Sequence, residues 1–376
     1  MKSKLRFIDL ELQKIRKNHL QRKLKYGITN GAIITIRKKN LINLCSNDYL
    51  GIPPIKMNLK QMESSSRLIS GNDESYQILE KKLARHKSYE ASLIFPTGYM
   101  TNLGVMPAIA KKGDLILSDE LNHASIIESC KLTGAKVCIF KHNNMEDLYS
   151  KLKSNQKNKF IISEGVFSMD GDFSKLKEIK DIATKTNAVT ILDDAHGDFV
   201  VGKDGKGTGN YFGVSKKIDL YISSLSKGLG SFGGYVSSQK NIIDLCVNRS
   251  KAFIYTSALP SFLIENSLKR FESNRKKYQN NLQANKKLLV KGLKEIGYSI
   301  NSKTHIVPII IGDEKKTMEF GQYLYKNGIF VRPIRYPTVP KNKARLRISI
   351  TGWLSHENIE NSLDVFDQAY KKFLKF

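Results

Sequence analysis

The sequence predicts an α/β fold in which a mixed, mostly parallel sheet carries helices on both faces, followed by a smaller α+β part. Between residues 75 and 194, short apolar runs alternate regularly with segments whose apolar residues recur at helical spacing. The apolar runs lack the polar alternation of half-exposed strands, which is typical of strands buried in a parallel sheet. At 376 residues, the chain is long enough for two or three domains.

The alternation can be followed element by element along the chain. The expected helices are residues 75–86, 99–110, 123–134, 145–154 and 174–185. The expected strands are residues 91–95, 114–118, 136–140, 159–163, 188–194, 219–222 and 233–238. Gly134 closes the third of these helices, as a C-terminal cap residue does.

The two ends of the chain depart from this alternation. Residues 5–26 have apolar positions at helical spacing on a very basic background, which predicts a surface or arm helix. The remaining expected elements are a strand at 32–36, a long helical region from about Pro260 to Leu293, strands at 306–311, 329–334 and 346–350, and a final helix from His356. We therefore expect three parts, namely an N-terminal arm and strand (1–42), a large α/β domain (43–280) and an α+β domain (281–376).

Composition excludes several classes of protein and favours a soluble cytoplasmic one. Hydrophobic residues make up 40% and charged residues 26% of the chain, which excludes disordered, collagen-like and coiled-coil proteins. The four cysteines form no CxxC pair and no cluster with histidine, which favours a reducing compartment and argues against a metal site. No apolar run approaches the roughly 18 residues of a membrane span, and the N-terminus lacks the apolar core of a secretory signal.

The chain is strongly basic, with a formal net charge of +27. Such a charge attracts polyanions, so a nucleic-acid-binding protein is one hypothesis. No nucleic-acid-binding motif accompanies the charge, and aromatic residues do not interleave the basic runs, so we expect no specific nucleic acid partner. The lysines are spread along the whole chain, and a lysine-rich composition without a functional role explains them equally well.

Ligands of open α/β sheets gather at the carboxyl ends of the strands, so the residues just after each strand are the candidates for chemistry. Thr97, Gly98 and Tyr99 form a turn that opens a helix, whose free amides suit a phosphate, although most such turns are only turns. Asp193 and Asp194 end a buried strand, where carboxylates are costly to desolvate, so we expect one of them to have a cationic partner. A helix cap, a structural ion pair or a metal ligand are alternatives for this pair.

Lys227 is the most informative of the strand-end residues. It follows an apolar strand and precedes glycines, so its amine is expected to face inward, where burial lowers its pKa and makes it a nucleophile toward carbonyls. Gly228, Gly230 and Gly233 also match a dinucleotide-binding pattern. That alternative fails because a strand follows instead of a helix, and no acidic residue stands about 20 positions further on.

His123 follows the strand at 114–118, and its flat imidazole could cover an aromatic ring, although a lone histidine is more often a cap or a surface residue. A phosphate cradle, a buried carboxylate, a carbonyl-reactive lysine and a flat side chain are together what a pyridoxal phosphate site needs. In such a site, the lysine forms the Schiff base and the carboxylate keeps the pyridine nitrogen protonated.

The motifs around these residues resemble those of the α-oxoamine synthases, over a stretch from about Arg22 to the last helix. The matching motifs, in chain order, are Asn47–Gly51, Thr97–Tyr99, Asn122–Ser125, Glu164–Asp172, Asp193–Gly197 and Ser226–Gly228. The resemblance implies a fold-type I pyridoxal phosphate enzyme that condenses an amino acid with an acyl thioester.

The resemblance also implies roles for individual residues. Lys227 holds the cofactor, Asp193 binds its ring nitrogen, and His196 binds its phenolic oxygen with Ser168 nearby. His123 stacks on the ring, and the phosphate is held by Gly98, Tyr99 and Ser224. The implied substrate contacts are Arg22, Asn47, Arg347 and Thr351, with Arg347 clamping the amino-acid carboxylate.

Family members are homodimers with the active site between subunits, and the stretch Tyr255, Thr256 and Ser257 reaches the phosphate of the neighbouring subunit. The segments 335–340 and 344–347 most resemble members that join L-alanine to a pimeloyl thioester of coenzyme A or acyl carrier protein in biotin synthesis. Members that use glycine with an acetyl thioester, or serine with a palmitoyl thioester, are the alternatives. Residues 63–67 depart from the family's glycine-rich run, which affects the backbone of that loop.

Overall fold

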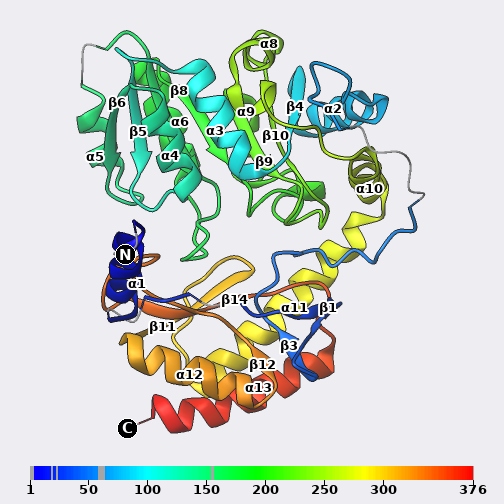
Figure 1. Cartoon of the computed structure of the whole chain (residues 1–376), viewed down its shortest axis with the longest axis vertical. Coiled ribbons are helices and arrows are strands. Elements are labelled where there is room, and N and C mark those ends of the chain that lie inside the picture. The colour runs from blue at the N-terminus through cyan, green and yellow to red at the C-terminus, as the bar shows by residue number, and fades with distance from the viewer. Residues whose placement is uncertain (1–3, 18–19, 23, 58–63, 154–155, 376) are drawn as a thin grey trace.

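The computed structural model describes residues 4–17, 20–22, 24–57, 64–153 and 156–375 (Figure 1). Its central element is a seven-stranded sheet with strand order β4-β10-β9-β8-β7-β5-β6. Every neighbouring pair is parallel except the two pairs that β10 makes, which confirms the predicted mixed, mostly parallel sheet. The strands are β4 (Ala91–Phe95), β5 (Leu115–Asp119), β6 (Lys136–Phe140), β7 (Lys159–Glu164), β8 (Val189–Asp193), β9 (Leu220–Ser224) and β10 (Gly234–Ser238).

Helices cover both faces of this sheet because successive strand residues point to opposite sides. Ile116 of β5 packs in one apolar cluster with residues of α3, α4 and α8, whereas Leu115 and Leu117 pack with residues of α5 and α6. The helices of the large part are α2 (Glu74–Lys87), α3 (Gly98–Ile109), α4 (Ala124–Leu132), α5 (Met145–Lys151), α6 (Leu176–Thr186), α7 (Thr208–Tyr211), α8 (Lys240–Arg249), α9 (Lys251–Ile254) and α10 (Ser261–Glu272).

The second part of the molecule is α+β, as predicted, and it recruits N-terminal strands. Its antiparallel sheet has the order β11-β14-β13, and a further sheet has the order β1-β2-β3-β12, so strands near the N-terminus join a strand of the C-terminal part (Figure 1). Its elements are β1 (Ile28–Asn30), β2 (Ile33–Ile36), β3 (Lys39–Asn43), α11 (Arg275–Ile296), β11 (Ile306–Gly312), α12 (Glu314–Lys326), β12 (Ile329–Phe330), β13 (Pro333–Ile334), β14 (Ala344–Ser349) and α13 (His356–Phe373). The division near residue 280 stays a prediction; it falls inside α11.

Three expected elements differ in the structure. The expected strand 329–334 is two strands in different sheets, because Pro333 has no N–H to continue the first ladder. The long helical region expected from about Pro260 to Leu293 consists of two helices, α10 and α11, and the Asn274 side chain caps α11 by accepting a hydrogen bond from the Lys277 amide. The arm helix α1 (Arg6–Lys17) is shorter than expected and buries none of its residues, so no packing extends it.

The ends of several elements carry caps that the sequence specifies. The Thr97 side chain accepts a hydrogen bond from the Met100 amide at the start of α3, and His123 does the same for Ser125 at the start of α4. Within the described ranges, no helix combines the length and the apolar character needed to cross a membrane.

Candidate active site

Lys227 lies in the turn after β9, and its side chain points inward. Its Nζ is 2.8 Å from Nε2 of His196, which follows β8. Burial lowers the pKa of Lys227, and interaction with Arg347 lowers it further, while Asp193 and Glu164 oppose these effects. The amine is therefore closer to its neutral, nucleophilic form than a surface lysine is.

Asp193 ends β8, and its carboxylate is held on both oxygens. Asn102 of α3 donates to Oδ2 at 2.7 Å, and the Ala195 amide donates to Oδ1 at 3.1 Å. Asn102 comes one helical turn after Gly98 and was not singled out from the sequence. A polar residue in an otherwise apolar helix was the available signal.

Within the described residues, neither Asp193 nor Asp194 forms an ion pair, so the expected cationic partner stays a prediction; burial raises the pKa of Asp194 to about 7, and nearby Lys87 opposes this rise. Asp194 is bound by the hydroxyl groups of Thr208 and Tyr221 at 2.8 and 2.9 Å. The cation, Lys87, instead pairs with Asp198. Lys87 and Asp198 are almost completely buried, and hydroxyl groups satisfy Asp194 without a second charge.

His196 belongs to a polar chain that reaches the second part of the molecule. Its Nδ1 is 2.6 Å from the Tyr49 hydroxyl, and Tyr49 donates to Oδ1 of Asn47 at 3.0 Å. Arg347 of β14 approaches Asn47 and Tyr49, each at 3.5 Å. Burial and the nearby cations Lys227 and Arg347 lower the pKa of His196 well below its ordinary value. Tyr49 lies within the Asn47–Gly51 motif, but no role was predicted for it.

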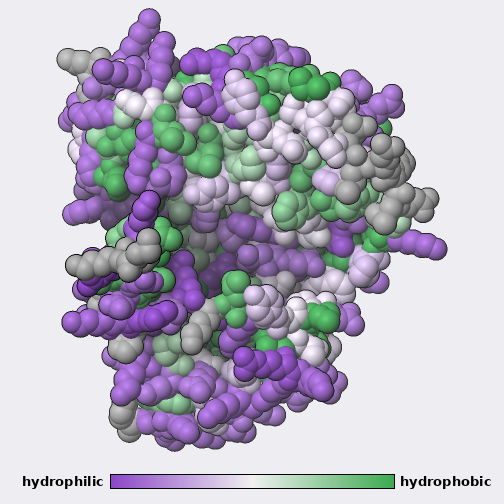
Figure 2. All heavy atoms as spheres, in the orientation of Figure 1, coloured by the Kyte–Doolittle hydropathy of each residue, from purple (hydrophilic) through white to green (hydrophobic). Residues whose placement is uncertain are grey.

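Arg347 also binds the loop that follows β7. Its Nε donates to the carbonyl oxygen of Ser168, and one Nη donates to the Ser349 hydroxyl at 2.7 Å. The guanidinium is thus half-buried between the two parts of the molecule, beside Asn47 and Tyr49. The surface is hollowed between these parts in the space-filling view (Figure 2).

The start of α3 forms a cradle with β9. A Cβ added to Gly98 would lie 3.2 Å from Cβ of Ser224, and one added to Gly234 would lie 2.5 Å from Cα of Gly98. Glycine therefore allows the first turn of α3 to approach the sheet closely. The leading amides of a helix have no partner within the helix, so those of Gly98 and Tyr99 are available beside the Ser224 hydroxyl.

His123 lies at the rim of this region. The residue is exposed at the surface, and its ring meets Tyr99 edge-on, with the ring centroids 6.2 Å apart. Burial of the ring nitrogens lowers the pKa of His123, Asp193 raises it, and Lys227 lowers it. Both electrostatic effects show that His123, Asp193 and Lys227 share one site.

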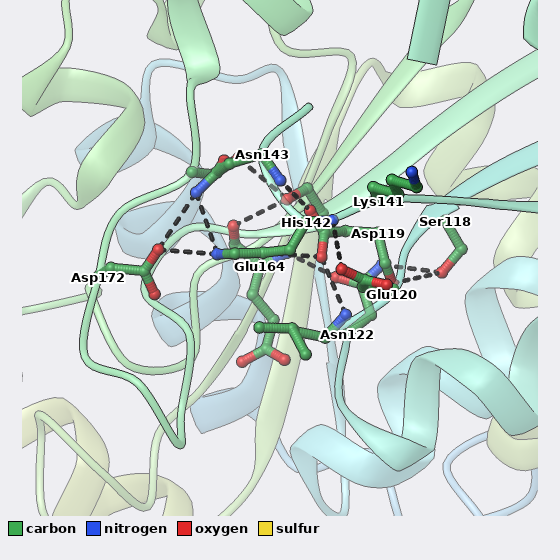
Figure 3. Close-up of polar contacts among 12 residues, drawn as sticks. Ser118, Asp119, Glu120, Asn122, Lys141, His142, Asn143, Glu164 and Asp172 are labelled. Atoms are coloured by element: carbon green, nitrogen blue, oxygen red, sulfur yellow. Dashed lines mark hydrogen bonds and ion pairs between the residues drawn. The ribbon is translucent and has the colours of Figure 1, made fainter. Parts of the chain in front are cut away.

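Glu164, at the end of β7, is a site residue that the sequence did not identify. It pairs in register with Asp193, so the two carboxyl groups leave the same side of the sheet. Asn122 accepts a hydrogen bond from its amide at 3.0 Å and fixes the strand end (Figure 3). Burial, and then the neighbouring Asp193, raise the pKa of Glu164 to about 8. Its Oε1 is buried without a hydrogen bond among the described residues.

The remaining predicted residues are placed as follows. Thr351 is buried, and its carbonyl oxygen accepts from Asn285 at 3.0 Å. Within the described part of the chain, no side-chain hydrogen bond of Arg22, Thr256 or Ser257 is seen, so their predicted contacts with substrate and with a second subunit stay predictions.

The departure from the family pattern at 63–67 lies partly outside the described residues, because Glu63 is not described. Arg67 has a packing role. It pairs with Glu80 at 2.6 Å and lies over the Tyr76 ring at 4.0 Å. This position therefore anchors the loop to α2.

These residues fit pyridoxal phosphate. The inward-facing amine of the half-buried Lys227 suits its aldehyde, the Asp193 carboxylate suits its ring nitrogen, and the glycine cradle at α3 suits its phosphate. Fold and site together define a pyridoxal-phosphate-dependent transferase of fold type I.

Comparison with known proteins agrees with this class. The family model described as aminotransferase class I and II matches residues 39–366, so the chain belongs to this family. The 8-amino-7-oxononanoate synthase of Thermoanaerobacter pseudethanolicus is 39% identical, covering 98% of each chain. A putative 8-amino-7-oxononanoate synthase of Methanocaldococcus jannaschii is 40% identical, covering 93% of this chain and 98% of that one.

Solved structures share the whole fold. Serine palmitoyltransferase of Sphingomonas wittichii superposes with a TM-score of 0.91 at 25% identity, covering 99% of this chain and 98% of that one. The 8-amino-7-oxononanoate synthase of Francisella tularensis superposes with a TM-score of 0.75 at 26% identity, covering 88% of this chain and 98% of that one. The fold-type I prediction is therefore confirmed.

Proposed function

We propose that this enzyme is an acyltransferase of biotin biosynthesis that condenses L-alanine with a pimeloyl thioester. A bond forms between Cα of alanine and the thioester carbonyl carbon, and the carbon–sulfur bond breaks. The alanine carboxylate leaves as carbon dioxide and a proton takes its place on Cα, which gives 8-amino-7-oxononanoate and the free thiol. The observation that carries the proposal is the 39% identity to an 8-amino-7-oxononanoate synthase over 98% of both chains, joined to a site built around a buried lysine.

The cofactor is pyridoxal phosphate, and we assign its contacts to the residues of the site. Lys227 would hold it covalently, Asp193 would keep a proton on its ring nitrogen, and His196 with Ser168 would bind its phenolic oxygen. His123 would cover the ring, and Gly98, Tyr99 and Ser224 would bind the phosphate. When bound, the cofactor supplies an aldehyde that captures the amino group and a ring that withdraws electrons from Cα.

Side chains of this protein then position the substrate and move the proton. Arg347 binds the amino-acid carboxylate through its planar fork, beside Asn47, and Thr351 and Arg22 complete the substrate contacts. The Lys227 amine would remove the proton from Cα, because burial lowers its pKa and so favours its neutral form. Asn102 and the Ala195 amide keep the Asp193 carboxylate aimed while this proton moves.

We also propose a homodimer that acts in the cytoplasm. The Tyr255 side chain is 81% exposed beside Thr256 and Ser257, which supports a role for this stretch against a second subunit's phosphate. All four cysteines are free, which supports a reducing compartment. The net charge of +27 suits a carrier that is anionic, whether coenzyme A or an acidic carrier protein.

Substrate competition tests the proposal. Alanine, glycine and serine are each combined with pimeloyl, acetyl and palmitoyl thioesters, and product and free thiol are measured. We expect the highest kcat/KM for alanine with the pimeloyl thioester. Turnover only with glycine and acetyl-CoA would overturn the assignment. Turnover only with serine and palmitoyl-CoA would instead support the alternative suggested by the serine palmitoyltransferase structures.

A further inference from the structure

A histidine outside the catalytic set bridges two carboxylates at the carboxyl end of the sheet. His142 follows β6; its Nδ1 is 2.9 Å from Oδ1 of Asp119, and its Nε2 is 2.8 Å from Oδ2 of Asp172 (Figure 3). Asp119 ends β5, whereas Asp172 belongs to the loop after β7. One imidazole therefore connects three segments that lie far apart in the sequence.

Both contacts require a proton on the histidine. A carboxylate oxygen only accepts hydrogen bonds, so two such contacts need an N–H on each ring nitrogen, which is the imidazolium. Burial by itself lowers the pKa of His142, but the hydrogen bonds to Asp119 and Asp172 outweigh it and raise the pKa to about 10. The ring also meets Phe167 edge-on, with centroids 4.4 Å apart, so its position is fixed on the loop side.

Asn143 reinforces the same bridge. Its amide donates to Oδ2 of Asp119 at 3.1 Å, and its side chain donates to the Phe173 carbonyl oxygen at 3.0 Å. Asn143 has a positive φ of 52°, which asparagine tolerates better than most residues. The chain is thus bent so that both the ring of His142 and the side-chain amide of Asn143 face the loop, while the backbone amide of Asn143 faces Asp119.

The opposite side of this loop, residues 165–173, is bound by the second part of the molecule. Arg345 donates to Oδ1 of Asp170 at 2.5 Å, and Thr304 donates to the Gly171 carbonyl oxygen at 2.8 Å. Arg347 donates through Nε to the Ser168 carbonyl oxygen. The loop therefore lies between the histidine bridge and the arginine that we assign to the substrate carboxylate.

We propose that His142 is a positioning residue: as an imidazolium shared by Asp119 and Asp172, it fixes loop 165–173, and through the Ser168 carbonyl it fixes the guanidinium of Arg347. The inference rests on the proposed role of Arg347. A substrate clamp needs a fixed orientation, because a displacement of about 1 Å at a positioning group can cost about a hundredfold in rate. Loss of the bridge therefore weakens binding of the amino acid more than binding of the thioester.

The test uses the cofactor-loaded protein and the variants His142→Gln, which cannot be charged, and His142→Arg, which is always charged. The dissociation constant of L-alanine is measured from the change in cofactor absorbance without any thioester, and deuterium exchange is followed in peptides covering 165–173. We expect His142→Gln to weaken alanine binding about tenfold and to speed exchange of the loop. His142→Arg should recover part of the alanine affinity and part of the protection of the loop from exchange.

His356→Gln is the matched control, because this imidazole is exposed and contacts only Glu360 among the described residues. It should leave binding and exchange unchanged. A lower melting temperature of His142→Gln with unchanged alanine affinity and unchanged loop exchange would overturn the proposal and leave only a structural role.

Two provisions keep the test decisive. If His142→Gln does not fold, Asp172→Asn removes the more exposed half of the bridge, and it must weaken alanine binding in the same direction or the proposal fails. Wild-type affinities for alanine, glycine and serine are measured first, and the tightest ligand is used. If the substrate assignment is wrong, the affinities of the wild-type protein for the three amino acids show it. If the positioning role is wrong, the ratio of variant to wild-type affinity shows it.

Discussion

His142 and His196 follow parallel strands of the same sheet, and their surroundings favour opposite charge states. His142 contacts the carboxylates of Asp119 and Asp172, which raise its pKa to about 10. His196 is buried beside Lys227 and Arg347, which lower its pKa well below the ordinary value. The anions around His142 belong to the protein itself. The groups around His196 are cations, which suits a site for an anionic cofactor and a substrate carboxylate.

Replacing Lys227 removes one of the two cations that lie beside His196. Lys227→Ala should lower kcat by at least about a thousandfold, because the amine both holds the cofactor and moves the Cα proton. Steady-state release of thiol measures the loss. Lys240→Ala, at an exposed lysine on α8, is the control and should retain activity. Activity of Lys227→Ala within tenfold of wild type would contradict the assignment.

Arg347 tests whether the same region binds a carboxylate. Arg347→Ala should raise KM for the amino acid about a hundredfold, because a charged, bidentate hydrogen-bond donor is lost. KM for the thioester should change much less. Arg347→Lys keeps the charge but not the fork, so it should recover only part of the affinity. Equal increases in KM for the amino acid and in KM for the thioester would show that Arg347 supports the structure of the whole site and does not bind the carboxylate alone.

His196→Gln addresses the neutral histidine of the comparison. The glutamine can still donate to an oxygen but cannot reproduce both ring contacts, to Lys227 and to Tyr49. We expect kcat to fall about tenfold to a hundredfold, with the cofactor absorbance band displaced. An unchanged spectrum together with unchanged kcat would remove His196 from the cofactor site.

The charged histidine predicts a pH-dependent stability. Folding raises the pKa of His142 from its ordinary value of 6.5 to about 10, so its stabilisation is complete below pH 6.5 and is lost as pH rises through 10. His142→Gln should therefore lower the free energy of unfolding by about 2–4 kcal/mol near pH 6, and the difference should shrink toward pH 10. Denaturant unfolding at several pH values measures this. A difference that does not vary with pH would argue against the imidazolium.

Much of the fold was predictable because it follows from local patterns. The buried parallel strands appear as apolar runs; Gly98 begins the helix after β4, Asp193 ends β8 and Lys227 lies in the turn after β9, each at the end of a predicted strand. The splitting of strand 329–334 follows from Pro333, a signal that was present but not applied. The break between α10 and α11 depends on a capping bond at Asn274, which an apolar pattern does not reveal.

The supporting residues of the site were less predictable because their partners are distant in sequence. Tyr49 meets His196 across 147 positions, and Asn102 meets Asp193 across 91. The bridge of His142 depends on two aspartates 23 and 30 positions away, on different segments. Which of many polar residues meet is decided by the packing of strands and loops, and no periodicity encodes it.

The most direct measurement locates the amine that carries the cofactor. The purified protein is loaded with pyridoxal phosphate, reduced with borohydride, digested and analysed by mass spectrometry. We predict that the modified peptide contains Lys227 and that no peptide is modified after L-alanine has displaced the lysine before reduction. Labelling of a different lysine, such as the buried Lys87, or the absence of any labelled peptide from the loaded protein, would contradict the account.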